Sequence, residues 1–249
     1  MKHLITKIRP AKGFSHIAHI AYTVFLPLIV YVFVRINLPQ LAVLMVVLSK
    51  WRMLAVRPRH WLAIFRANAV DLVVGISIVV FMSQTNIILW QMVWVLIYMT
   101  WLLFIKPGNS VLSVAMQALI AQSFGLMAVY LAWGEAPLWG LIIATWAVCY
   151  SAARHFFTGF DEPYGRFFSD VWAFFAASLA FITGHWLLFY GLVAQPTLLL
   201  TVVGFGLATM YYLDTFDKLS KMLRRQFIFI MLAIIIVVVV FSDWGDKAI

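Results

Sequence analysis

The lysine and arginine residues of this chain fall in every second gap between about nine apolar runs. Sixteen of the 18 basic residues lie in these alternate gaps, and Arg35 and Lys247 lie in the others. Cytoplasmic loops of membrane proteins carry an excess of Lys and Arg. The pattern therefore predicts a polytopic membrane protein. Because the runs are solidly apolar, they predict helices; the strands of a membrane barrel would alternate apolar and polar residues.

The expected fold is an all-α bundle of about nine transmembrane spans, with a cytoplasmic N-terminus and the C-terminus outside. Only 11% of the residues are charged and the mean hydropathy is +0.98, so we expect one integral membrane domain over residues 1–249. The runs cover about residues 14–34, 38–56, 69–83, 87–105, 111–133, 137–153, 170–190, 195–213 and 226–241.

The second run is the weakest, because Ser49, Lys50 and Arg52 interrupt it. If the first two runs form a re-entrant hairpin, the chain has seven spans and the charges keep the same sides. The sequence leaves open whether the second run crosses the membrane.

Residues 50–66 are predicted to form a basic segment along the cytoplasmic interface. Five basic residues and two tryptophans occur in this segment: Lys50, Arg52, Arg57, Arg59, Arg66, Trp51 and Trp61. The positive-inside rule accounts for the net charge of +9 without a nucleic-acid partner. We expect membrane lipids, with anionic headgroups at the cytoplasmic face, as partners. The simplest location is a cell membrane, the bacterial inner membrane.

The densest group of polar residues is the predicted cytoplasmic loop 154–169. With one acid from the third span, the candidate polar site comprises Arg154, His155, Asp161, Glu162, Arg166, Asp170 and Asp71. Arginine can clamp a phosphate, and a histidine beside a carboxylate can act as an acid–base pair. The alternative is an ordinary solvated loop with helix caps and ion pairs.

Three neutral polar residues inside the spans, Gln91, Gln117 and Gln122, would line a permeation path if they converge. No charged residue falls near a predicted bilayer midplane, which argues against a familiar ion-coupled pump. Cys149 is the single cysteine, so no intrachain disulfide or cysteine-based metal site is possible. We expect no metal and no cofactor.

Three classes of function remain open. The first is transport or permeation of a small or lipid-like solute through a cytoplasmic polar vestibule. The second is a membrane-embedded enzyme that acts on a lipid headgroup at the cytoplasmic face. The third is a non-catalytic subunit or scaffold, either in a homo-oligomer or in a larger membrane complex.

Two features bear on helix packing. Small residues four apart predict close contact between helices: Ala173/Ala177, Ala176/Ala180, Gly140/Ala144 and Gly204/Ala208. The last run has no polar residue after Gln226, which predicts a peripheral helix that faces lipid or a partner helix.

Overall fold

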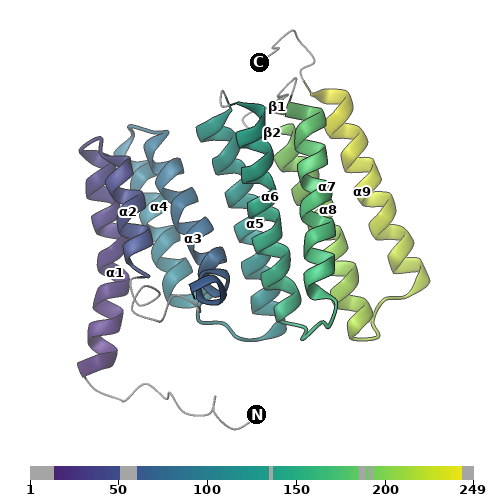
Figure 1. The fold of residues 1–249 in the computed structure, drawn as a ribbon, viewed down its shortest axis with the longest axis horizontal. Helices are drawn as coiled ribbons and strands as arrows, with labels where there is room; N and C mark the ends of the chain where they lie inside the picture. Colours follow the sequence, from purple (N-terminus) through teal and green to yellow (C-terminus); the bar gives the residue numbers. More distant parts are fainter. Residues whose placement is uncertain (1–13, 51–60, 135–136, 185–188, 191–192, 243–249) are drawn as a thin grey trace.

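The computed structural model describes residues 14–50, 61–134, 137–184, 189–190 and 193–242, which form nine α-helices and a short hairpin (Figure 1). The helices are α1 (Phe14–Arg35), α2 (Pro39–Leu48), α3 (Trp61–Ser83), α4 (Ile88–Thr100), α5 (Val111–Trp133), α6 (Leu138–Thr158), α7 (Gly165–Gly184), α8 (Gln195–Thr215) and α9 (Lys221–Phe241). A π-helix, η3 (Trp101–Ile105), continues α4. Strands β1 (Phe189–Tyr190) and β2 (Val193–Ala194) pair antiparallel. The predicted all-α class is confirmed.

Six helices in the described part of the chain are long and apolar enough to cross a membrane, as in a multi-pass membrane protein. They are α3, α4 with η3, α5, α7, α8 and α9. Helix α2 has 10 residues and a length of about 15 Å, half of the roughly 30 Å hydrocarbon core, so it is too short to cross alone. The orientation across a bilayer stays a prediction.

Several helices extend beyond the apolar runs that predicted them. Helix α3 begins at Trp61, so residues 61–66 of the predicted interfacial segment are its first turns, and residues 51–60 lie outside the described ranges. Helix α6 continues to Thr158 and α7 begins at Gly165, so the predicted loop 154–169 is only the turn 159–164. The cause is general: the ends of membrane helices reach the headgroup layer, where polar residues are tolerated.

Successive helices alternate in direction, so one end of the bundle collects the starts of α1, α3, α5, α7 and α9 (Figure 1). We call this the basic end. Most of the described Lys and Arg residues lie at the basic end, either in the helix turns nearest to it or in the connections between helices there. They are Lys50, Arg66, Lys106, Arg154, Arg166, Lys218, Lys221, Arg224 and Arg225. Arg35 ends α1 at the opposite end.

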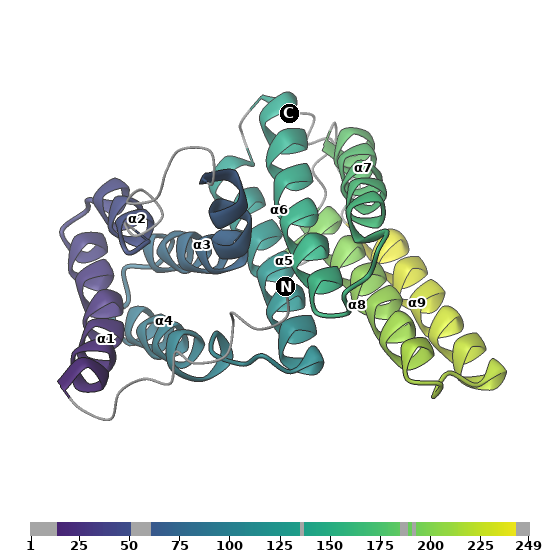
Figure 2. The same ribbon diagram turned by 60° about the horizontal axis from the view of Figure 1, so that its bottom comes forward.

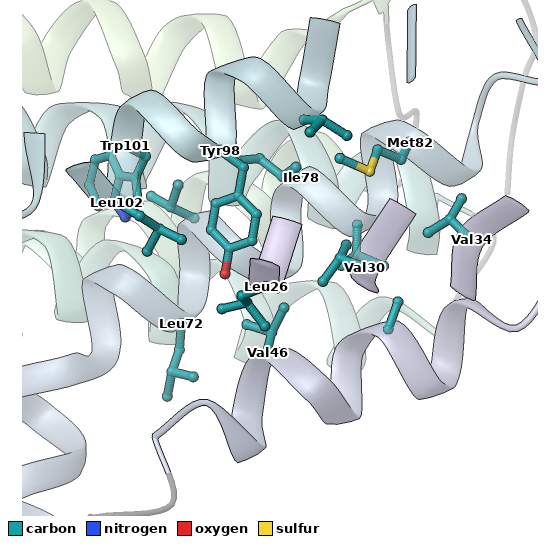
Figure 3. Close-up of a cluster of buried hydrophobic side chains, with 14 of the residues drawn as sticks. Leu26, Val30, Val34, Val46, Leu72, Ile78, Met82, Tyr98, Trp101 and Leu102 are labelled. Atoms are coloured by element: carbon teal, nitrogen blue, oxygen red, sulfur yellow. The ribbon is translucent and has the colours of Figure 1, made fainter. Parts of the chain in front are cut away.

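The bundle has two parts, with α1–α4 on one side of α5 and α6 and with α7–α9 on the other (Figure 2). The core of the first part consists of aliphatic side chains around Tyr98, which points toward Leu26 and Val46 (Figure 3). Gly75 makes room for this ring, because a Cβ there would lie 2.9 Å from the Tyr98 hydroxyl oxygen and 2.7 Å from Val46.

The second part is built from two helix pairs. Helix α7 packs most extensively on α6, with the small residues Ala173, Ala176 and Ala180 fully buried, as their spacing predicted. Helix α9 packs on α8, and most of its side chains are exposed. The predicted peripheral position of the last helix is confirmed.

Candidate functional site

A cavity of about 580 Å³ lies between α5, α6, α7 and α8. This volume falls in the range of roughly 300–1,000 Å³ that is typical of sites for small molecules. The lining is almost wholly apolar and carries no charged side chain: Ala118, Leu119, Gln122, Ala152, Ala153, Phe156, Phe157, Phe168, Val171, Trp172, Phe175, Val203, Gly204, Leu207, Ala208 and Tyr211. The cavity therefore suits an uncharged, largely apolar group.

Small residues of three helices, α5, α6 and α8, line the cavity. Ala118, Ala152 and Ala153 on α5 and α6 lie across from Gly204 and Ala208 on α8. Large side chains would close helix–helix gaps, whereas small ones leave space when the helices are held apart by aromatic neighbours. The aromatic walls come mainly from α6 and α7.

Exposed residues on α7 and α8 also line the cavity. Val171 and Phe175 of α7 and Leu207 of α8 are exposed on the outside of the bundle. Helices α7 and α8 contact each other little. The cavity therefore opens sideways between these two helices, toward the surface that would face lipid.

Gln122 is the one amide in the cavity wall, and both ends of its amide are bonded. Its Nε2 donates to the Leu200 carbonyl at 3.0 Å, and its Oε1 accepts from Trp172 Nε1 at 2.9 Å. Gly204 permits this approach, because a Cβ there would lie 2.5 Å from Gln122 Nε2. Gln122 thus joins α5, α7 and α8 through two hydrogen bonds.

At the basic end of the cavity the Tyr211 hydroxyl donates to a carboxylate oxygen of Glu162. The Tyr211 ring packs edge-on against Phe156, Phe157 and Phe160. Glu162 belongs to the turn between α6 and α7, so this bond ties the turn to α8. Through Tyr211, which lines the cavity, the Glu162 carboxylate is joined to the basic end of the cavity.

The other predicted residues of the 154–169 segment do not form a common cluster. His155 Nε2 donates to Gln117 Oε1 at 2.8 Å, which turns it toward α5. Arg154 packs beside Gly165 at the start of α7. Asp161 is exposed with a positive φ of 52°, as in a left-handed turn.

Arg166 and Asp170 form an exposed i,i+4 ion pair at 4.0 Å on the first turns of α7. Such surface pairs contribute little to stability. The described geometry thus places Glu162 at the cavity and leaves Asp161, Arg166 and Asp170 on the outer surface of the basic end.

Asp71 lies apart from that segment, in a buried cluster within the first part of the bundle. Lys50 and Lys106 both bind its Oδ2, the latter at 2.6 Å, and Trp101 Nε1 donates to its Oδ1 at 2.8 Å. These donors come from the turn after α2, from η3 and from the connection between η3 and α5. Burial lowers the pKa of Lys50, the Asp71 carboxylate raises it, and the neighbouring Lys106 ammonium lowers it; together they bring the pKa to about 8.

The three glutamines are bonded at three different levels of the bundle. Gln117 Nε2 donates to the Ile105 and Gly108 carbonyls at 2.7 and 3.0 Å, so it fixes the connection that carries Lys106. Gln91 Nε2 donates to the Thr85 carbonyl at 2.8 Å at the opposite end, beside a polar pocket of about 240 Å³. Gln122 lies between these levels. The three side chains are not in contact with one another.

Several residues of the site had no clear sequence signal. Trp172 and Tyr211 resemble the other aromatic residues of the spans. Lys50 and Lys106 resemble ordinary cytoplasmic charges. One signal was available: Asp71 is the only acidic residue among the first 134, beside 11 basic ones, so a partner of opposite charge was to be expected.

Comparisons of the chain with family models, with curated proteins and with solved structures found no match. Function is therefore inferred from the geometry of the cavity and of the Asp71 cluster.

Proposed function

We propose that this multi-pass membrane protein takes a lipid-like molecule from the bilayer into the cavity between α5 and α8, in the course of transport or permeation. The observation that carries the proposal is the uncharged cavity of about 580 Å³, which opens sideways between α7 and α8. An apolar chain can enter by this route without passing through water.

The lining favours an aliphatic or isoprenoid chain over a polar solute. Burial of apolar surface contributes about 25 cal/mol per Å², and a charged group would lose its hydration there without a partner. A polar headgroup would remain at the basic end, near Glu162 and Tyr211. Both features are those of an amphipathic ligand.

The placement of the glutamines favours a lipid-like ligand over a small polar one. Gln91, Gln117 and Gln122 each donate to backbone carbonyls of their own surroundings. Gln117 Oε1 also binds His155 and Gln122 Oε1 binds Trp172, so among the three amide oxygens only Gln91 Oε1, far from the basic end, has no partner. A path for a polar solute needs groups that are free to replace its hydration shell.

The enzyme alternative has less support. His155 is held by Gln117, and Asp161 and Asp170 are exposed, so no acid–base pair faces the cavity among the described residues. The scaffold alternative is supported by the apolar outer face of α9 alone.

The test uses phospholipids that carry a photoactivatable diazirine at the end of one acyl chain. The protein is reconstituted in nanodiscs that contain them, irradiated and digested, and the labelled peptides are identified by mass spectrometry. The expected result is labelling of the cavity faces of α6, α7 and α8. Ala208→Trp, which fills the cavity, should lower this labelling by roughly tenfold, since about 1.4 kcal/mol of lost binding gives that factor.

The matched control is Ala233→Trp, an equal change on the exposed face of α9. It should leave labelling of the cavity peptides unchanged. Movement of a fluorescent lipid between leaflets of proteoliposomes is then compared for the same three proteins. Labelling that is confined to α9 and other outer faces, or that is unaffected by Ala208→Trp, would contradict the proposal.

A further inference from the structure

The two halves of the chain differ sharply in charge balance. Residues 1–134 contain 11 Lys and Arg residues and one acid, whereas residues 135–249 contain seven basic and eight acidic residues. In the second half, basic groups find acids within the chain: Arg166 pairs with Asp170, and Arg224 pairs with Asp214 at 3.3 Å. The first half has only Asp71 to offer, so its cations far outnumber the acids of the same half.

Both oxygens of the Asp71 carboxylate are bound by donors of this chain. Two ammonium groups bind one oxygen and an indole N–H binds the other, which leaves the cluster with one surplus positive charge. The Lys50 side chain is 11% exposed, while the Lys106 side chain is 39% exposed. The surplus charge is therefore presented outward through Lys106.

Lys106 is held in place more firmly than an ordinary surface lysine. Its ammonium is anchored by Asp71, and its carbonyl lies in the connection that Gln117 binds. An ammonium has three N–H donors, and one bond to Asp71 leaves donors for a second acceptor. A pre-positioned cation loses less conformational freedom on binding than a mobile one.

The cluster also lies near the basic-end boundary of the candidate membrane spans. Asp71 is in the basic-end half of the span Ile64–Ser83, and Lys106 follows the span Ile88–Ile105 directly. We propose that Lys106, backed by Lys50 and Asp71, binds the phosphate group of an acidic phospholipid in the cytoplasmic leaflet. This site is separate from the cavity and does not depend on the function proposed for it.

The experiment measures binding of phosphatidylglycerol to the full-length protein by native mass spectrometry, from nanodiscs of phosphatidylcholine with increasing phosphatidylglycerol. Lys106→Gln keeps the buried pair of Lys50 with Asp71, so the fold is retained. One basic residue near a membrane surface contributes about a fivefold change in binding affinity. Lys106→Gln should therefore lower the affinity for the most tightly bound phosphatidylglycerol molecule by about fivefold. Lys106→Arg, which keeps the charge, should restore most of it.

The control is Lys218→Gln, which removes an equal charge from the exposed connection between α8 and α9. In this variant the affinity of the most tightly bound phosphatidylglycerol molecule should equal that in the native protein. An equal loss in Lys106→Gln and Lys218→Gln would mean diffuse attraction to the surface and would overturn the proposal, as would no loss in Lys106→Gln.

A second arm adds inorganic phosphate to the native protein and to Lys106→Gln. Competition with phosphatidylglycerol in the native protein alone would support the phosphate site and would show that free phosphate can occupy it. If inorganic phosphate does not compete, but binding of phosphatidylglycerol still needs Lys106, the site binds the phosphate group only when it is part of a lipid in the membrane.

Discussion

Trp101 and Lys106 bind the two oxygens of one carboxylate, although they are five positions apart along the chain. Trp101 Nε1 lies 2.8 Å from Asp71 Oδ1, and Lys106 Nζ lies 2.6 Å from Asp71 Oδ2. In a regular α-helix, residues five apart point about 140° away from each other, because each residue turns the helix by about 100°. The π-helix η3, closed by the bond from Lys106 N to the Trp101 carbonyl at 2.8 Å, brings both onto one face.

This relationship predicts that a deletion in η3 destabilises the protein less than an insertion does. Deletion of Phe104, whose side chain is 75% exposed, leaves Trp101 and Lys106 four apart, a spacing at which a plain α-helix also puts them on one face. The deletion should therefore cost less than about 1 kcal/mol of unfolding free energy. Insertion of one alanine after Phe104 makes the spacing six and should cost more, about 2 kcal/mol, because the Asp71 bonds are lost.

Both variants are measured by unfolding in mixed detergent and sodium dodecyl sulfate, with Phe104→Ala as the control for the lost side chain. If the deletion destabilises as much as the insertion, the π-helix has some role other than the alignment of these two residues.

Asp71→Asn should be the most destabilising substitution of a charged residue in the first half of the chain. It leaves two ammonium groups beside a neutral amide, and removal of one partner of a buried ion pair costs about 3 kcal/mol or more. Asp170→Asn removes an acid from the exposed pair with Arg166 and should cost about 0.5 kcal/mol. The same unfolding measurement compares the two, and equal effects would contradict the buried nature of the Asp71 cluster.

Lys50 should lose its proton near pH 8, well below the ordinary lysine value of 10.5, because it is buried and lies beside Lys106. The sign for stability follows from proton linkage. Between about pH 8 and 10.5 the unfolded chain holds a proton at Lys50 that the folded chain has released. The contribution of Lys50 to stability therefore rises with pH across this window, is complete above pH 10.5 and is absent below pH 8.

The measurement is ¹³C nuclear magnetic resonance of reductively methylated protein, with the Lys50 signal assigned from Lys50→Arg. Lys106→Gln should raise the pKa of Lys50, since one neighbouring positive charge is removed. A Lys50 signal that titrates with the surface lysines would refute the burial of this side chain.

The hydrogen bonds of Gln122 should show coupling with Trp172 in a double-mutant cycle. Gln122→Met and Trp172→Phe each remove the bond of 2.9 Å between them, so the double variant should lose less than the two single losses combined. For side-chain bonds between membrane helices the coupling is about 1 kcal/mol. Ser178→Ala with Trp172→Phe provides an uncoupled pair, since Ser178 binds the Phe174 carbonyl of its own helix.

The fold could be predicted largely from the sequence, because apolar runs and basic gaps report directly on helices and their ends. The fifth helix, Val111–Trp133, matches its run at both ends. Helix α7 does not match its predicted run 170–190, since it begins at Gly165 and ends at Gly184; its first residues include Gly165, Arg166 and Ser169, which look like loop. Likewise α2 ends at Leu48, before the basic residues that share its apolar run.

The site was harder to predict, because it depends on contacts between helices that no local pattern records. Asp71 was singled out as an ionisable residue in a span, but its partners Lys50 and Lys106 come from connections 21 and 35 positions away. The cavity depends on which small residues of α5, α6 and α8 line it: Gly204 and Ala208 were expected to bring helices together, not to line a cavity, and Ala152 looks like any other small residue. Glu162 was a candidate from its loop, while its partner Tyr211 had no signal.

The pairing of α6 with α7 and of α8 with α9 has a mechanical consequence for the cavity. The two helices of each pair pack against each other, while α7 and α8 contact each other little. A change in the width of the opening would therefore need only a small relative movement of the two pairs, limited by the bonds of Gln122 to Trp172 and to Leu200, with the alanine contacts of α7 left intact. A bilayer that presses harder on the sides of the bundle would narrow the opening, so lateral pressure in the membrane becomes a variable that sets how readily the cavity fills.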